Sequence, residues 1–221
     1  MPVPVAGPAD RNYWSAPPIW QGETCYILGG GPSLKAVDVE RLRGARVIAV
    51  NEAYLLGDWL PVVFFGDCRW YVWHKSRLLH FGGLKVTTCR TCVNQPGIKR
   101  MRKVNHPRGL ESRRDALKWN WSSGAAAINL AVHFGVQRIV LLGFDMRAVG
   151  KETHWHDHYT HDPKRDPYAR FLKGFPDLAK ALASLRVECV NACPGSALQD
   201  FPIVEPDSVL PPPPPAGEDE P

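Results

Sequence analysis

The feature that most constrains the fold is a repeated alternation of short apolar runs with segments of helical spacing. The runs Thr24–Leu28, Arg46–Val50, Pro61–Phe65 and Arg138–Leu142 are rich in β-forming residues. Tight hairpin signals between the runs are missing from the sequence. Such an alternation favours βα units around a mainly parallel sheet. We therefore expect a Rossmann-like α/β fold, with a mainly parallel sheet flanked by helices in a single domain.

Further elements follow from the same patterns. Helices are expected over Leu34–Leu42, Arg69–His80, Ala125–Phe134 and, interrupted by Gly174 and Pro176, Tyr168–Leu185. Ser122 or Ser123 is the expected cap of the third helix, and Gly135 its end. Two more strands are expected, Lys85–Cys89 and Val187–Val190.

Composition divides the 221 residues into three parts. Residues 1–22 predict an irregular N-terminal lead-in, residues 23–204 the Rossmann-like domain, and residues 205–221 a disordered, Pro-rich acidic tail. Within the domain, residues 93–121 predict a basic loop or a lid. Its basic residues are Lys99, Arg100, Arg102, Lys103, Arg108, Arg113, Arg114 and Lys118.

The charge of the chain limits its partners. The net charge is +5, from 27 basic and 22 acidic residues, and the tail contributes acids but no bases. A basic body suits a phosphorylated ligand, a nucleotide or nucleic acid, although a solvated surface has the same composition. No apolar run reaches the roughly 20 residues of a membrane span, and the N-terminus lacks a secretion signal. We therefore expect a cytoplasmic protein without a membrane span.

The six cysteines are expected to be reduced, because no secretion signal accompanies them. Cys89 and Cys92 form a Cys-x-x-Cys motif, but a second closely spaced pair is missing. A structural zinc site and buried small apolar side chains are both open, and we favour the second.

A glycine-rich turn follows the first expected strand. Gly29, Gly30, Gly31, Pro32 and Ser33 form it, and backbone amides at such a junction can face a phosphate. Leu34 stands where the dinucleotide fingerprint has its third glycine, and the P-loop lysine is missing, so neither motif is indicated. A tight turn without a ligand is the alternative.

Polar residues follow other expected strands in the same way. Asn51 offers an amide to a base or a sugar hydroxyl, whereas Asp67 and Asp145 offer carboxylates to ribose hydroxyls or Mg²⁺. Each is also a common cap or turn residue. Because the carboxyl ends of parallel strands meet at one rim, we expect these residues and the glycine turn to form one ligand site.

Four histidines fall within eight residues of one segment: His154, His156, His158 and His161. One of them could act as a general base, with Asp157 or Asp162 orienting it. Alternating histidines could instead chelate a metal, or could be incidental in a surface loop. We favour the base over the metal because the His-Glu-x-x-His motif is absent.

The basic segment raises the alternative of a nucleic-acid surface. Trp119 and Trp121 lie beside it and could stack on a base. Recognised nucleic-acid-binding modules are missing from the sequence, so a solvated face or a lid is the favoured interpretation.

Successive motifs resemble those of a bacterial family typified by lipooligosaccharide sialyltransferases. They are Ile27–Leu34, Val50–Tyr54, Ser122-Ser123-Gly124 and Ile139–Asp145, in matching order and spacing. His154–His161 resembles that family's His-containing loop, and Ala192–Ser196 its Cys-x-Pro-x-Ser-like turn. The resemblance covers about residues 23–210.

A second resemblance rests on Gly143–Met146 followed by Thr153-His154. These residues look like a motif of the archaeal hydroxymethylpterin diphosphokinase-like proteins, a related Rossmann-like family. The compact length and the Thr-His-Trp-His run look most like the short phage-type members of that family. A phage origin would place the protein in the cytoplasm of the host.

The sialyltransferase resemblance implies a nucleotide-dependent glycosyltransferase that moves a sugar from a CMP-sugar donor to an acceptor hydroxyl. The donor would bind across the glycine turn, Asn51 and Ser122-Ser123-Gly124, and His156 or His154, with His158 as a further candidate, would deprotonate the acceptor. No metal would be required. The acceptor is open, and homo-oligomers occur in the resembled family.

The sequence also departs from that family. Gly30 stands where the family has Asn, and Gly66-Asp67-Cys68 stands where it has Asn-Pro-Ser. A gained carboxylate suits a Mg²⁺-bound phosphate, so the first alternative is Mg²⁺-dependent diphosphoryl transfer from ATP to a small alcohol, with Asp67 and Asp145 as metal ligands. A non-enzymatic nucleic-acid-binding accessory protein is the further alternative.

Overall fold

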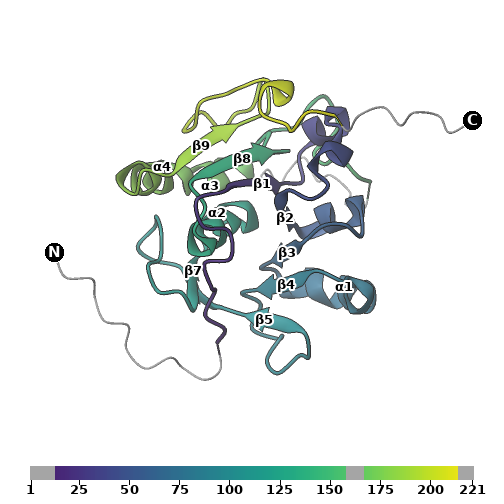
Figure 1. Cartoon of the computed structure of the whole chain (residues 1–221), viewed down its shortest axis with the longest axis vertical. Coiled ribbons are helices and arrows are strands. Elements are labelled where there is room, and N and C mark those ends of the chain that lie inside the picture. Colours follow the sequence, from purple (N-terminus) through teal and green to yellow (C-terminus); the bar gives the residue numbers. More distant parts are fainter. Residues whose placement is uncertain (1–12, 158–166, 214–221) are drawn as a thin grey trace, which may run out of the picture.

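The computed structural model describes residues 13–157 and 167–213, and a seven-stranded parallel sheet forms its centre (Figure 1). The strands are β1 (Thr24–Leu28), β2 (Arg46–Val50), β3 (Val62–Phe65), β4 (Leu84–Thr87), β5 (Ile98–Arg100), β8 (Arg138–Leu142) and β9 (Glu188–Asn191). Their order is β5-β4-β3-β2-β1-β8-β9. Strands β6 (Arg102–Val104) and β7 (Ala116–Lys118) form a separate parallel pair. The predicted fold class, a single Rossmann-like α/β domain, is confirmed.

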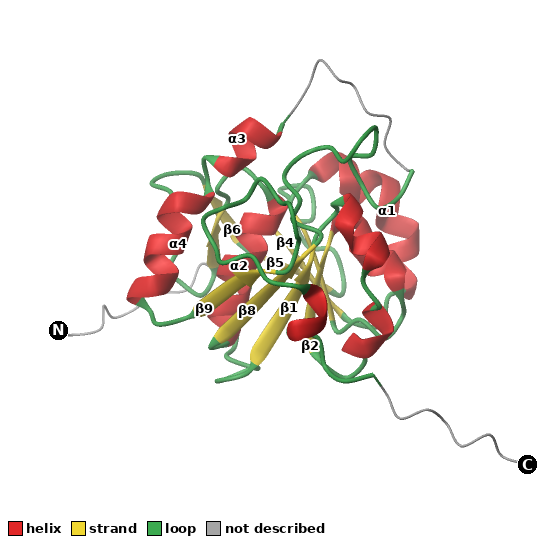
Figure 2. Cartoon of the chain, turned by 90° about the horizontal axis from the view of Figure 1, so that it is seen from above, coloured by secondary structure: helices red, strands yellow, loops and turns green. Residues whose placement is uncertain are grey.

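Helices lie on both faces of the sheet (Figures 1 and 2). They are α1 (Cys68–His80), α2 (Ser123–Phe134), α3 (Tyr168–Leu172) and α4 (Phe175–Ser184). Local sequence sets their ends. Asp67 caps α1 and Ser122 caps α2 with its hydroxyl, while Gly135 ends α2 in the left-handed conformation. None of the helices in the described residues is long and apolar enough to cross a membrane.

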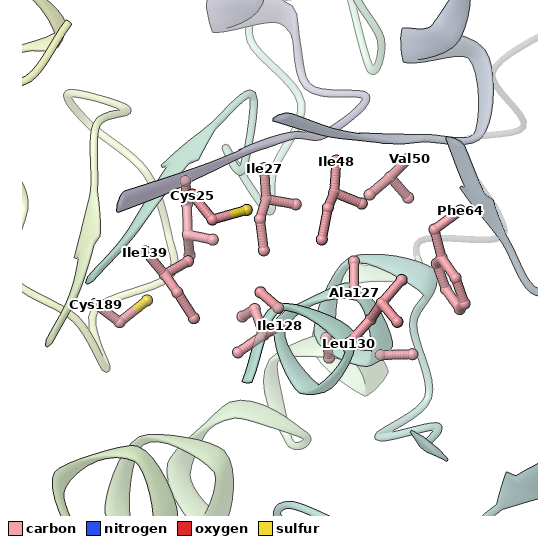
Figure 3. Close-up of a cluster of buried hydrophobic side chains, with 14 of the residues drawn as sticks. Cys25, Ile27, Ile48, Val50, Phe64, Ala127, Ile128, Leu130, Ile139 and Cys189 are labelled. Carbon is pink, nitrogen blue, oxygen red and sulfur yellow. The ribbon is translucent and has the colours of Figure 1, made fainter. Parts of the chain in front are cut away.

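The core follows from the two-residue period of the strands. Cys25 and Ile27 of β1 and Ile48 of β2 face α2, where they meet Ile128 and other apolar side chains (Figure 3). The intervening strand residues pack on the opposite face, against α1 and the 3₁₀ turns. Both faces of the sheet are therefore buried, as the continuous apolar runs of its strands require.

The strand order changes direction at β1. Strands β2 to β5 extend from one side of β1, and β8 and β9 extend from the other. Ligands of open α/β sheets bind beyond the carboxyl ends of the strands at such a switch point. The connections that leave β1 and β8 at this edge therefore mark the expected site.

Several segments differ from the sequence-based expectations. Residues 34–42 form parts of two 3₁₀ helices, Pro32–Ala36 and Val39–Leu42, rather than one helix, because the chain turns extended at Val37. The basic segment 93–121 contains β5, β6 and β7. The lead-in from residue 13 is packed, with Ala16 and Trp20 buried in the core.

The start of the tail also differs from expectation. Residues 205–213, expected to be disordered, include a 3₁₀ helix, Pro206–Ser208, and the buried side chain of Leu210. Arg41 fixes this stretch, since its guanidinium donates to the carbonyl of Pro211 and to the Asp207 carboxylate. The buried Leu210 side chain and the hydrogen bonds of Arg41 thus order a stretch that its proline content predicted to be disordered.

Candidate functional site

A pocket with a volume of about 340 Å³ opens at the carboxyl edge of the sheet. Its walls come from the turns after β1, β2 and β8, the N-terminus of α2, the His-containing loop and α3. Most of the predicted site residues lie in these walls: Gly29, Gly30, Gly31, Asn51, Asp67, Ser122, Ser123, Gly124 and His154. The sequence therefore located the pocket, although its residues do not all have the expected roles.

The glycine turn is built for close packing. An added Cβ at Gly29 would lie 2.5 Å from the carbonyl oxygen of Gly143, and one at Gly31 would lie 1.9 Å from Asp145 Oδ2. The amides of Gly29 and Gly31 donate to the carbonyls of Leu142 and Gly143. These two glycines thus join the turns after β1 and β8, and the expected row of phosphate-facing amides is not present here.

Asp145 takes part in the same junction. Its carboxylate accepts the hydroxyl of Ser33 at 2.7 Å and the Ser33 amide at 3.2 Å, and the residue is 4% exposed. Asp145, Pro32 and Ser33 do not line the pocket. The predicted role of Asp145 as a ribose or metal ligand is therefore replaced by a structural one.

The turn after β9, residues 192–196, forms hydrogen bonds with the turn after β8. Ser196 donates its hydroxyl to the carbonyl of Phe144 at 2.6 Å, and the Phe144 amide donates to Cys193 Sγ at 3.0 Å. Burial raises the pKa of the Cys193 thiol to about 11. The Cys-x-Pro-x-Ser-like turn thus positions Phe144. An added Cβ on Gly124 would lie 2.7 Å from Cε1 of the Phe144 ring, so only glycine fits beside this ring.

The N-terminus of α2 faces the pocket with unused amides. The hydroxyl of Ser122 accepts the amide of Ala125 at 3.1 Å, and the Ser122 carbonyl accepts that of Ala126. For the amides of Ser123 and Gly124, the described part of the chain holds no acceptor. A helix N-terminus of this kind attracts an anion through its amides and its dipole.

Asn51 lines the same pocket, directly after the end of β2. It adopts a left-handed backbone conformation with φ 53°, which Asn tolerates better than most residues. Its Oδ1 atom is buried, and none of the described residues donates a hydrogen bond to it. A buried amide oxygen without a donor is the feature expected where a ligand supplies the missing group.

Trp119 and Trp121 form one wall. Trp119 stacks over Gly66, where an added Cβ would lie 2.1 Å from the ring, and the Lys103 ammonium lies 3.4 Å from the ring centroid. Burial lowers the pKa of Lys103. Aromatic faces at a pocket wall provide a surface on which a base can stack.

Of the two loop histidines within the described residues, His154 lines the pocket. Its Nδ1 atom lies 2.9 Å from Thr153 Oγ1, and its ring lies against Gly30, where an added Cβ would be 3.2 Å from His154 Cδ2. The amide of Trp155 donates to the Gly30 carbonyl at 3.0 Å. The loop is thus fixed on the one glycine of the turn whose missing side chain makes room for it.

His156 has a different position. Its side chain is 4% exposed and does not line the pocket, and Nε2 lies 3.8 Å from Glu52 Oε2. Glu52 Oε1 accepts from Trp70 Nε1 at 2.7 Å and lies 3.2 Å from His74 Nε2. His156 therefore belongs to a buried polar cluster beneath the pocket. His158 and His161 lie outside the described residues.

Some pocket residues had no assigned role in the sequence-based prediction, among them Glu52, Tyr168, Arg170 and Phe171. Glu52 directly follows Asn51, so its place at a strand end was the available signal. The other three lie on α3, a five-residue helix without a motif. The Tyr168 hydroxyl donates to the carbonyl of Thr153 at 2.9 Å, which connects α3 to the histidine loop.

The two expected magnesium ligands, Asp67 and Asp145, both accept hydrogen bonds from neighbouring groups of the protein. Asp67 lines the pocket and accepts the Arg69 amide at 2.7 Å as the cap of α1, whereas Asp145 is held by Ser33. Within residues 13–157 and 167–213, no three His, Cys, Asp or Glu side chains are arranged to hold a metal ion. Of the two carboxylates that the diphosphoryl-transfer alternative requires, that of Asp145 is thus engaged by Ser33, and that of Asp67 lies at the pocket.

The basic segment is attached to the body of the protein. Buried Asn129 of α2 accepts the amides of Glu111 and Lys118, at 2.9 and 3.0 Å, and Arg114 donates to the carbonyls of Ala16 and His133. Arg113 pairs with Asp115 at 3.1 Å. Much of its positive charge is thus used internally, and the segment forms a pocket wall rather than a free lid.

The fold is similar to those of two solved glycosyltransferases. The sialyltransferase CstII from Campylobacter jejuni, solved with the substrate analogue cytidine-5'-monophosphate, matches with a TM-score of 0.51 and 17% identity over 83% of this chain and 85% of that one. The MAf glycosyltransferase from Magnetospirillum magneticum AMB-1 matches with a TM-score of 0.62 and 13% identity over 89% of this chain. This chain spans only 36% of that enzyme.

No protein-family model matches the sequence, and no curated protein matches it. The structural similarity therefore shows the class of fold, an α/β fold that this chain shares with these two glycosyltransferases.

Proposed function

We propose that the protein is a glycosyltransferase that binds a nucleotide-sugar donor in this pocket and transfers the sugar to an acceptor hydroxyl. The observation that carries the proposal is the pairing, in one pocket, of the unused amides of Ser123 and Gly124 with the buried, undonated Oδ1 of Asn51. Amides suit a phosphate, and a carboxamide oxygen suits the amino group of a base or a sugar hydroxyl. The glycosyltransferase folds described above support the same class of donor.

The phosphate would bind at α2 rather than at the glycine turn. The helix has 12 residues, so its dipole is fully developed and favours an anion at its N-terminus. The base of the nucleotide would lie toward Asn51, with Trp119 and Trp121 available for stacking. A cytidine nucleotide is our first choice of donor.

His154 is the proposed general base. It faces the pocket, and its contact with Thr153 can fix the tautomer: when Nδ1–H donates to the Thr153 hydroxyl, Nε2 carries the lone pair that accepts a proton. The acceptor hydroxyl would lose its proton to Nε2 as its oxygen attacks the anomeric carbon, and the nucleotide would leave with its phosphate held at α2. No metal ion is part of the proposal.

The first experiment is a thermal-shift panel with CMP, CDP, CTP, UDP, GDP, ADP and ATP, each with and without Mg²⁺. A ligand at about 100 times its Kd stabilises the native state by about 2.7 kcal/mol, which raises the Tm of a chain of this size by about 5–10 °C. We expect CMP to stabilise without Mg²⁺. Stabilisation by ATP alone, and only with Mg²⁺, would support the diphosphoryl-transfer alternative and contradict the proposal.

The catalytic role is tested with His154→Ala and the matched variant His80→Ala, which changes an exposed histidine at the end of α1. His154→Ala is expected to lower the hydrolysis of the donor about 10²–10⁴-fold while nucleotide binding is retained. His80→Ala is expected to behave as wild type. Equal activity of the two variants would remove His154 from the mechanism.

A further inference from the structure

Three cysteines from separate parts of the sequence meet outside the pocket. Cys68 is the first residue of α1, and Cys89 and Cys92 follow the end of β4. The Sγ atoms of Cys68 and Cys89 are 2.7 Å apart, and Cys89 Sγ lies 2.9 Å from Thr91 Oγ1. Cys89 and Cys92 are each 1% exposed, whereas Cys68 is partly exposed. The cluster therefore has a route to solvent through Cys68.

A metal does not account for this cluster, because the described residues contain no arrangement of three His, Cys, Asp or Glu ligands that could hold one. The proposed transfer reaction does not use it either. Two interpretations remain: the cysteines are buried small side chains without chemistry, or they carry thiol chemistry, which needs a thiolate, a second sulfur within reach, and access for an oxidant.

The surroundings favour a thiolate at Cys89. The hydrogen bond from Cys92, with further contributions from Cys68 and Thr91, lowers the pKa of Cys89 to about 5. The same interaction raises the pKa of Cys92. Cys68 lies at the N-terminal end of the 13-residue helix α1.

We propose that Cys68 and Cys89 form a reversible disulfide under oxidation by a peroxide. The Cys89 thiolate attacks one oxygen of hydrogen peroxide and becomes a sulfenic acid, and hydroxide leaves. The Cys68 sulfur then attacks the sulfenic sulfur, so that an S–S bond forms and water leaves. Two thiols and one peroxide thus give one disulfide and two waters, and an external dithiol supplies the two electrons that reverse the step.

The position of the bridge connects it to the pocket. Asp67, directly before Cys68, caps α1 and lines the pocket, and Gly66 carries the stacked Trp119 ring. A Cys68–Cys89 bond would tie this wall to the end of β4. The chemistry of the bridge itself does not depend on the proposed transferase activity.

Tryptic peptide mapping tests the proposal directly, because the sequence separates the three cysteines. Cleavage after lysine and arginine places Cys68 in residues 47–69, Cys89 in residues 86–90 and Cys92 in residues 91–99. After treatment of the full chain with a small excess of hydrogen peroxide and alkylation of remaining thiols, we expect a cross-link between 47–69 and 86–90. Dithiothreitol is expected to restore both free peptides.

Two variants make the result decisive. Cys68→Ser is expected to abolish the cross-link, and Cys92→Ser is expected to keep it. A cross-link between 86–90 and 91–99 in wild type would overturn the choice of partner. Full alkylation of all three thiols after peroxide, or stoichiometric zinc in the purified protein that is released when the thiols are alkylated, would overturn the proposal.

Discussion

Asn129 is, together with His133, a residue of α2 through which the basic wall of the pocket is attached to this helix. It is completely buried, and its Oδ1 accepts the backbone amides of Glu111 and Lys118 while Nδ2 donates to the Glu111 carbonyl at 3.2 Å. Leucine has a similar volume but no polar atoms. Asn129→Leu would therefore keep the packing and leave the partly buried amide and carbonyl of Glu111 and the buried amide of Lys118 without their partner.

The size of the effect follows from these three groups. Each buried polar group that loses its hydrogen bond costs about 1–3 kcal/mol, and local relaxation recovers part of the total. The variant also avoids the cost of burying the polar Asn side chain, which offsets part of this loss. We therefore expect Asn129→Leu to lower the free energy of unfolding by about 3 kcal/mol. For a chain of this size the Tm would fall by about 6–12 °C.

The assay is chemical unfolding in urea together with limited tryptic digestion at Arg113 and Arg114. Asn105→Leu is the matched control, because Asn105 is exposed in the same segment and its change is expected to stay within about 0.5 kcal/mol. Asn129→Leu should also speed cleavage at the two arginines. Equal stability and equal cleavage in the two variants would refute the view that this segment is a fixed wall.

Three further predictions concern the glycine turn, the histidine loop and pH. Gly31→Ala places a Cβ 1.9 Å from Asp145 Oδ2 and is expected to lower the free energy of unfolding by about 3 kcal/mol. In the control Gly82→Ala, the added Cβ meets nothing within 4 Å, so the free energy of unfolding should change by less than about 1 kcal/mol. Urea unfolding measures both variants. Thr153→Val removes the hydroxyl beside His154 Nδ1 and should lower kcat about 10-fold with little change in KM, with rescue by Thr153→Ser; equal loss in both variants would contradict the tautomer argument. Burial lowers the pKa of His133 below its ordinary 6.5, so the unfolded chain takes up a proton at higher pH than the folded chain does. Stability should therefore fall as the pH drops below about 6.5, by at most about 1.4 kcal/mol per pH unit. The free energy of unfolding of His133→Gln should fall less between pH 7.5 and 5.5, and an unchanged fall would exclude His133 as its source.

Local sequence patterns predicted most of the fold. The apolar runs are strands within one or two residues, and Ser122 and Gly135 bound α2 as expected, because caps and strand periodicity depend on neighbouring residues. The rim of the sheet was predictable too, since parallel strands carry their carboxyl ends to one edge. Hence Asn51 and Gly124 were placed correctly in one pocket.

The roles that were not predicted depend on contacts between distant segments. Nothing near Asp145 in the sequence indicates that its partner is Ser33, 112 residues away, instead of a ligand. The same holds for His156, which is separated from Glu52 by about half of the chain and meets it only in the folded state. The attachment of the basic segment likewise depends on Asn129 and His133, two buried polar residues of the largely apolar helix α2.

The most direct test of the central claim, that the N-terminus of α2 holds the phosphate of a nucleotide, is calorimetric binding of CMP to wild type and to Ser123→Pro. Proline is tolerated at the first position of a helix, and the extended backbone of Ser122 (φ −141°, ψ 150°) suits a residue before proline, so the fold should be kept while one amide donor is removed. Loss of a hydrogen bond to a charged group, about 1.5–3 kcal/mol, predicts an affinity about 10- to 150-fold weaker at an unchanged Tm. Equal CMP affinity in the two proteins, or no CMP binding by wild type, would contradict the account.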